Sequence, residues 1–199
     1  MAGLTLVIGL SPAPLSIRII GVAIALLLVA IAVYDLRYTL MPDLWVYGFI
    51  LFSIAASVVT LGTGAFNVYF LIAGPLISLP LYAMWFFSDG RWMGFGDVKF
   101  ALGIGWLLGI PLGYVALCFA FVIGAIVGVC ILLPLQRLKA LFSSGITRYA
   151  HEGAGFTMKS EVPFGPFLII GLCICWLSSL YSIPLIENLV AFLSLNFLS

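Results

Sequence analysis

The stretch "LSIRIIGVAIALLLVAIAVY", residues 15–34, decides the structural class of this protein. It is apolar throughout except for Ser16 and one charged side chain, Arg18. An α-helix needs about 20 such residues to cross the hydrocarbon core of a bilayer. The whole chain has the same character, with 64% hydrophobic residues, 8% charged residues and a mean hydropathy of +1.30. Because soluble domains carry about 25% charged residues, we expect an all-α integral membrane protein.

Hydropathy along the chain predicts six transmembrane helices. The segments lie near 15–34, 44–61, 68–87, 98–112, 114–135 and 163–183. The segment 98–112 is short and rich in glycine, which suits close packing between membrane helices. The last 15 residues contain Glu187 and Asn188, and we expect them to lie at an interface rather than to cross. The expected fold is one membrane-embedded domain over 1–199, a polytopic bundle of about six helices.

The basic residues predict the orientation of this bundle. The first, third and fifth loops between the predicted spans hold seven of the eight cations, namely Arg37, Arg91, Lys99, Arg137, Lys139, Arg148 and Lys159. By the positive-inside rule these loops face the cytoplasm, and both termini lie outside. The bilayer is therefore an expected partner. Nucleic acid is not, because a net charge of +1 with no basic run offers no surface for a phosphate backbone.

Four acidic residues fall at the same predicted face: Asp35, Asp43, Asp89 and Asp97. Asp35 ends the first predicted span and Asp97 begins the fourth. An ionisable group at a membrane edge is costly unless it is paired or wet, which favours a functional role. If the two carboxylates meet, one keeps a proton while the other is charged. Such a pair can activate a water against an amide carbonyl and protonate the departing nitrogen, without a metal or cofactor.

Glycines precede Asp97 in "GFGDVK", residues 94–99. Gly94 and Gly96 permit tight turns and let an extended peptide approach the backbone closely. The alternative for Asp97 is a structural one, a carboxylate that caps the N-terminus of a helix. The four cysteines lie in apolar runs without a CxxC pair, so we interpret them as buried small apolar residues rather than ligands or redox groups.

Three stretches in order resemble the bacterial type IV prepilin peptidases, membrane aspartyl proteases of the GxGD type. They are "DLRYTLMPD" at 35–43, "GFGDVK" at 94–99 and "VPFGPFL" at 162–168. The resemblance implies that Asp35 and Asp97 form the catalytic pair. It also implies motif residues that support the site or the approach of substrate, which are Gly94, Gly96, Lys99, Pro42, Asp43, Pro163, Phe164, Gly165 and Pro166.

The resemblance further implies the kind of substrate and the side of the membrane where it is cleaved. The substrate would be a pilin-like or pseudopilin-like precursor with a short basic leader and a hydrophobic helix. Cleavage would follow a glycine at the cytoplasmic face of the inner (cytoplasmic) membrane. Larger family members carry an insert with two CxxC pairs that is associated with N-methylation. This chain lacks the insert, so we expect peptidase activity without methyltransferase activity and without zinc.

Several alternatives stay open at this point. Asp43 fits an N-terminal helix charge, Lys99 either supports Asp97 or marks the membrane boundary, and Pro163, Gly165 and Pro166 either shape the site or set the entry of the last span. "YD" at 34–35 with "GFGD" also resembles presenilin and signal peptide peptidase, although P-F-G-P replaces their P-A-L motif. A small proton-coupled transporter with the two aspartates as a relay is the other alternative. The oligomeric state is left open.

Overall fold

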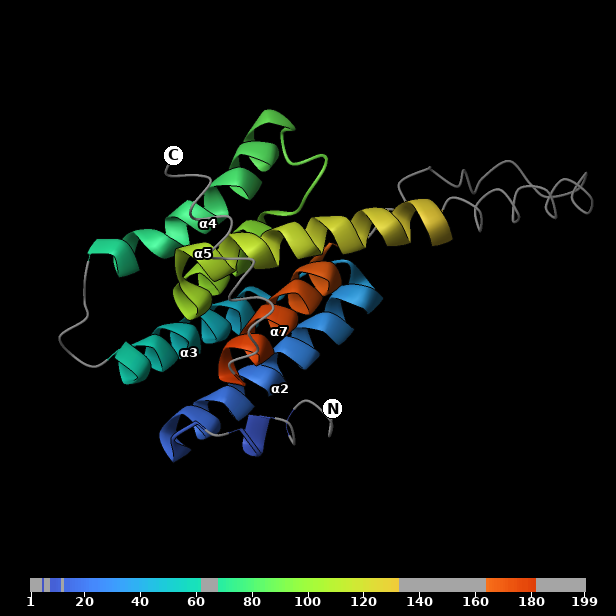
Figure 1. Ribbon diagram of the computed structural model, residues 1–199. Helices are drawn as coiled ribbons and strands as arrows, with labels where there is room; N and C mark the ends of the chain where they lie inside the picture. Colours follow the sequence, from blue (N-terminus) through green and yellow to red (C-terminus); the bar gives the residue numbers. More distant parts are fainter. Residues whose placement is uncertain (1–4, 6–7, 12, 62–67, 133–163, 182–199) are drawn as a thin grey trace, which may run out of the picture.

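The computed structural model describes residues 5, 8–11, 13–61, 68–132 and 164–181. Within these ranges the chain is helical and contains no strand, which confirms the predicted all-α fold (Figure 1). Four helices of the described part are long and apolar enough to cross a membrane, and a fifth apolar helix is shorter. The protein is thus a helical membrane protein, and the count of six spans stays a prediction.

The helices follow one another with short connections where the structure describes them. Their bounds are α2 Leu15–Tyr38, α3 Asp43–Leu61, α4 Val68–Phe87, α5 Phe95–Val127, the π-helical turn η2 Gly128–Leu132, and α7 Gly165–Leu180. Helix α2 continues past Asp35 to Tyr38. The next residue, Thr39, has a left-handed backbone (φ 52°), and its N–H donates to the Asp35 carbonyl. Asp35 therefore lies inside the last turn of α2 rather than at its end.

Helix α5 is broken at Gly109, where the backbone has φ 73° and ψ −176°. A positive φ favours glycine, and Pro111 follows within the first turn of the next segment, where a missing N–H costs little. The chain turns back at this break. Phe164 lines a pocket with Asp97 and also packs its ring 5.0 Å from that of Phe121. In one straight helix, positions 97 and 121 would be about 36 Å apart.

The folded-back α5 is the centre of the bundle, and small residues let its neighbours approach it. A Cβ on Gly105 would lie 2.7 Å from the Cα of Gly74 in α4. A Cβ on Gly171 of α7 would collide with the backbone of Ala116. On the α3 side, the fully buried rings of Phe49 and Phe100 stack at 4.6 Å. Such packing is typical of helices in lipid, where no hydrophobic drive pulls them together.

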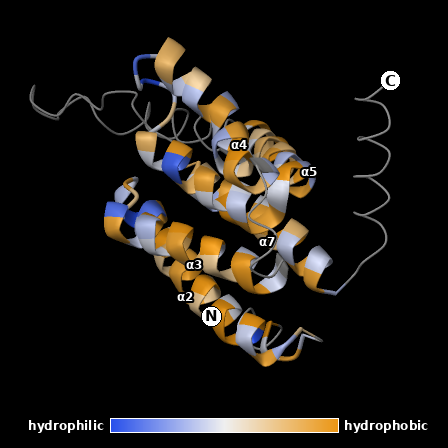
Figure 2. Cartoon of the chain, turned by 90° about the vertical axis from the view of Figure 1, so that its left-hand side faces the viewer, coloured by the Kyte–Doolittle hydropathy of each residue, from blue (hydrophilic) through white to orange (hydrophobic). Residues whose placement is uncertain are grey.

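Polar and apolar surfaces are separated along the bundle. Figure 2 shows hydrophilic residues gathered mainly at one end of the helices, while the sides are largely apolar. Large apolar side chains such as Leu26, Leu51 and Val122 are more than half exposed on these sides. Surfaces of this kind are suited to lipid rather than water. The prediction that all four cysteines are buried is wrong for Cys118 and Cys130, which are exposed on the surface of the bundle.

Candidate active site

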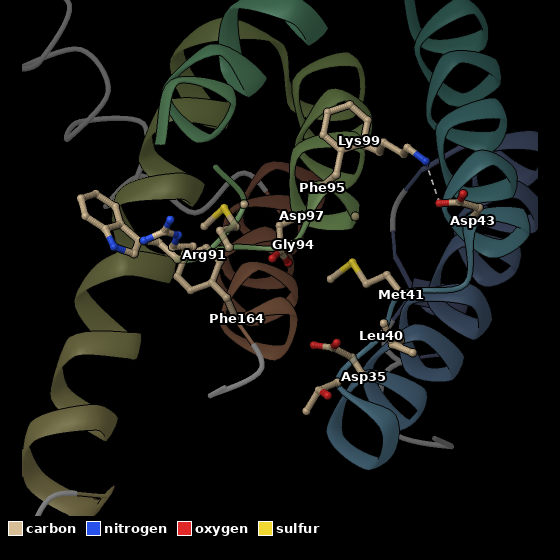
Figure 3. A pocket seen from close by; sticks show the side chains of 15 residues that line it. Asp35, Leu40, Met41, Asp43, Arg91, Gly94, Phe95, Asp97, Lys99 and Phe164 are labelled. Atoms are coloured by element: carbon tan, nitrogen blue, oxygen red, sulfur yellow. Dashed lines mark hydrogen bonds and ion pairs between the residues drawn. The ribbon is translucent and has the colours of Figure 1, made fainter. Parts of the chain in front are cut away.

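A pocket of about 380 Å³ opens at the polar end of the bundle (Figure 3). It is built by the end of α2 with the connection to α3, by the connection from α4 to α5, by the first turns of α5, and by the residue before α7. Its lining residues are Asp35, Thr39, Leu40, Met41, Asp43, Gly90, Arg91, Trp92, Met93, Gly94, Phe95, Gly96, Asp97, Lys99 and Phe164.

Asp35 reaches the pocket from the last turn of α2. Asp35 is almost fully buried, with 5% of its surface exposed. Its Oδ2 atom is buried and has no hydrogen-bond partner among the residues that the structure describes. A buried polar atom without a partner costs stability, so the position of this carboxyl group needs an explanation.

Asp97 reaches the same pocket from the first turn of α5. The helix begins after Gly94, which is extended (φ −72°, ψ 147°), and the Asp97 N–H donates to the Gly94 carbonyl at 3.2 Å. Asp97 is 8% exposed. Figure 3 shows the carboxyl groups of Asp97 and Asp35 pointing into the pocket from different helices. The structure thus brings the two predicted acids together, and their catalytic role stays a prediction.

Gly165 places the start of α7 directly against Asp35. A Cβ built on Gly165 would lie 2.5 Å from the Asp35 Oδ2 atom and 3.1 Å from its Cγ atom. Phe164 precedes it, and the Phe164 carbonyl accepts the N–H groups of Phe167 and Leu168. Pro166 is the second residue of α7, a position that tolerates proline because its N–H has no helical partner. The predicted residue Pro163 lies outside the described residues.

The two glycines before Asp97 have different surroundings. A Cβ on Gly96 would lie 2.9 Å from the Cβ of Met41, so the Met41 side chain covers this glycine. Gly94 is open, and the nearest atom to its Cβ position is the Asp97 Oδ2 atom at 3.9 Å. The predicted close approach of a peptide is therefore available at Gly94 and is obstructed at Gly96.

The lysine after Asp97 pairs with a different acid. The Lys99 Nζ atom donates to the Asp43 Oδ1 atom at 2.8 Å, and it lies 5.3 Å from the ring centres of Tyr47 and Phe95. Asp43 is the first residue of α3, as the N-terminal helix charge would require. Pro42 accepts the N–H groups of the following turn. Together these contacts join α3 to α5 at the mouth of the pocket.

Some pocket residues were not singled out in the sequence. Met41, Met93 and Trp92 line the pocket but carry no charge that would separate them from the rest of an apolar chain. For Met41, the sequence offers one indication of a role in the site, which is its position within the stretch 35–43. Among the described residues, no group of three or more His, Cys, Asp and Glu side chains is placed to hold a metal ion. The loop 136–161 and the last 15 residues are outside the described part.

The profile of the type IV leader peptidase family matches residues 22–129, which is more than half of the chain. The chain belongs to the type IV leader peptidase family. Neither the curated proteins nor the solved structures gave a match.

Membership of the type IV leader peptidase family confirms the resemblance that the three stretches indicated. It implies type IV leader peptidase activity, and hence a membrane-embedded hydrolase. The matched range contains Asp35, Pro42, Asp43 and Asp97, and it ends before α7. The third stretch, 162–168, lies beyond the matched range, and the structure places its Phe164 and Gly165 at the pocket.

Proposed function

We propose that this leader peptidase is an aspartic-type endopeptidase that uses Asp35 and Asp97 as its catalytic pair. The observation that carries the proposal is the meeting of two almost fully buried carboxyl groups, from α2 and α5, in one pocket. In a chain with 8% charged residues, two acids from distant segments rarely share a pocket without a chemical role.

The chemistry follows from the pairing of the acids. One carboxylate accepts a proton from a water molecule as the water oxygen attacks the carbonyl carbon of the substrate. The other carboxyl group holds a proton, because two close carboxylates do not both ionise, and it donates a hydrogen bond to the carbonyl oxygen. The carboxyl group that took the proton from water then passes it to the amide nitrogen. The carbon–nitrogen bond breaks, and two chain ends leave the pocket.

The shape of the bundle suits a precursor with a polar leader and a hydrophobic helix. The hydrophobic helix of a prepilin-like substrate would lie in lipid along the apolar sides, and the bond to be cut would reach the polar end. The cation count supports a cytoplasmic position for this end of the bundle, and we expect the product to leave without a methyl group.

Position also distinguishes this proposal from a proton-coupled transporter. Asp35 lies in the last turn of α2 and Asp97 in the first turn of α5, so both acids are at one end of the bundle. A relay across the membrane needs ionisable groups near the middle of the spans. The acids therefore favour the peptidase over the transporter.

The direct test is cleavage by the purified protein in liposomes. We expect the wild type to convert a prepilin into two fragments whose masses locate one cut before the hydrophobic helix, with no methyl group added. Asp35→Asn and Asp97→Asn keep the side-chain shape and should abolish the fragments. The proposal is wrong if the wild type cuts none of several prepilins, or if either variant cuts at the wild-type rate.

A further inference from the structure

Met41 occupies the space between the two halves of the candidate site. Its Cβ atom covers Gly96, which immediately precedes Asp97, and the end of its side chain contacts Gly165, which lies against Asp35. Figure 3 shows Met41 between Asp35 and Asp97, with its sulfur atom directed across the pocket. One apolar side chain thus extends from the Asp97 side of the site to the Asp35 side.

Glycine stands at both contact points of this side chain. Any other residue at 96 or 165 would overlap the present position of Met41, since the Cβ atoms would meet the Met41 Cβ and Cε atoms. The side chain is partly buried and packs against the apolar core. Met41 therefore packs against both glycines, and its side chain limits the space between the two carboxyl groups.

We propose that Met41 is a specificity-determining residue that limits the size of the substrate side chain just before the cleaved bond, where the resemblance implies a glycine. The proposal rests on the proposed function, because it concerns a peptide bond held between Asp35 and Asp97. The open backbone at Gly94 leaves room for a peptide beside Asp97. A side chain on that peptide that projects toward Asp35 meets the Met41 thioether.

Methionine suits this place for a physical reason. Its unbranched side chain is long enough for the Cβ atom to lie against Gly96 while the Cε atom lies against Gly165. Glycine or alanine beside the cleaved bond fits next to it, whereas valine or leucine must displace it from both glycines. The residue just before the cleaved bond is thereby restricted to a small one.

The test compares Met41→Ala and Met41→Leu with the wild type on a panel of prepilins. The panel carries Gly, Ala, Val or Leu at the residue just before the cleaved bond, and kcat/KM is measured for each. We expect Met41→Ala to raise the ratio of kcat/KM for large over small residues at least about tenfold, which is the discrimination that one or two methylene groups give. Met41→Leu has a similar volume and should keep the wild-type ratio.

The panel separates this proposal from the proposed function. Cleavage of the parent prepilin by the wild type, with loss in Asp35→Asn, upholds the peptidase whatever Met41 does. An unchanged ratio in a Met41→Ala protein that still cuts the parent prepilin overturns the role of Met41 alone. If Met41→Ala does not fold, Met41→Val removes part of the same side chain, and the same ratio decides. A wild type that cuts nothing overturns both proposals together.

Discussion

At the scale of single residues, the site depends on where side chains are missing as much as on where they are charged. Gly165 has no side chain, and this lets the start of α7 lie against the Asp35 carboxyl group. The atoms that a Cβ would meet there belong to the ends of two side chains, Asp35 and Met41. These ends can move, so a substitution should displace the site rather than unfold the helix.

We predict that Gly165→Ala folds but cleaves a prepilin at least about tenfold more slowly, because displacing one carboxyl group by a fraction of an ångström costs catalytic geometry. The measurement is kcat/KM together with thermal unfolding in detergent. Gly48→Ala is the matched control, since its Cβ would lie 3.6 Å from the nearest atom, a Leu27 methyl group. Equal rates for Gly165→Ala and Gly48→Ala would show that Gly165 does not position Asp35.

Some residues of the site could be predicted from the sequence, and others could not. Asp35 and Asp97 stand out because charge is rare in this chain, and the structure places both in one pocket. Met41 does not stand out, since an apolar residue in an apolar chain gives no signal until its neighbours in space are known. For Lys99, sequence left its partner undecided, and the structure gives Asp43, a residue from another helix.

At the scale of helices, α3 is held to α5 by two contacts of different kinds. The Lys99–Asp43 ion pair lies at the mouth of the pocket, where Asp43 is largely exposed. The Phe49 ring is fully buried against Phe100, and it fills the space that a side chain at Gly103 would take. Exposed ion pairs contribute little to stability, so the aromatic contact should dominate.

We predict that Phe49→Ala lowers the free energy of unfolding by about 3–5 kcal/mol, the usual cost of removing a buried aromatic ring. Lys99→Met should leave the unfolding transition nearly unchanged. Both effects are measured by denaturant unfolding in detergent micelles, followed by circular dichroism. A larger loss for Lys99→Met than for Phe49→Ala would mean that the ion pair holds these helices together.

At the scale of the whole molecule, the polar end and the apolar sides define how the bundle sits in a membrane. Hydropathy could predict the all-α fold because α-helices satisfy every backbone group within one segment in lipid. It did not predict where α2 stops, because the helix continues past the apolar segment to Tyr38, and the backbone becomes left-handed at Thr39. The predicted segments 98–112 and 114–135 divide at residue 113, whereas the chain turns back at Gly109.

We predict that the pocket and the start of α2 face opposite sides of the membrane. In a protein with all four cysteines replaced by alanine, Arg91→Cys at the pocket should react with an impermeant maleimide only in inside-out vesicles. Ser16→Cys at the exposed start of α2 should react only in right-side-out vesicles. Labelling of both positions from one side would contradict the predicted orientation.

The claim that Asp35 and Asp97 act as one catalytic unit is tested most directly by a double-mutant comparison. The measurement is kcat/KM for prepilin cleavage by Asp35→Asn, Asp97→Asn and the protein with both changes, with Asp43→Asn as the control acid at the pocket mouth. Residues that act as a unit are strongly non-additive. We therefore expect each single variant to lose activity by orders of magnitude, the double variant to lose no more than either one, and Asp43→Asn to keep most of its activity. Independent losses that multiply in the double variant would contradict a shared site, as would near-normal cleavage by either single variant.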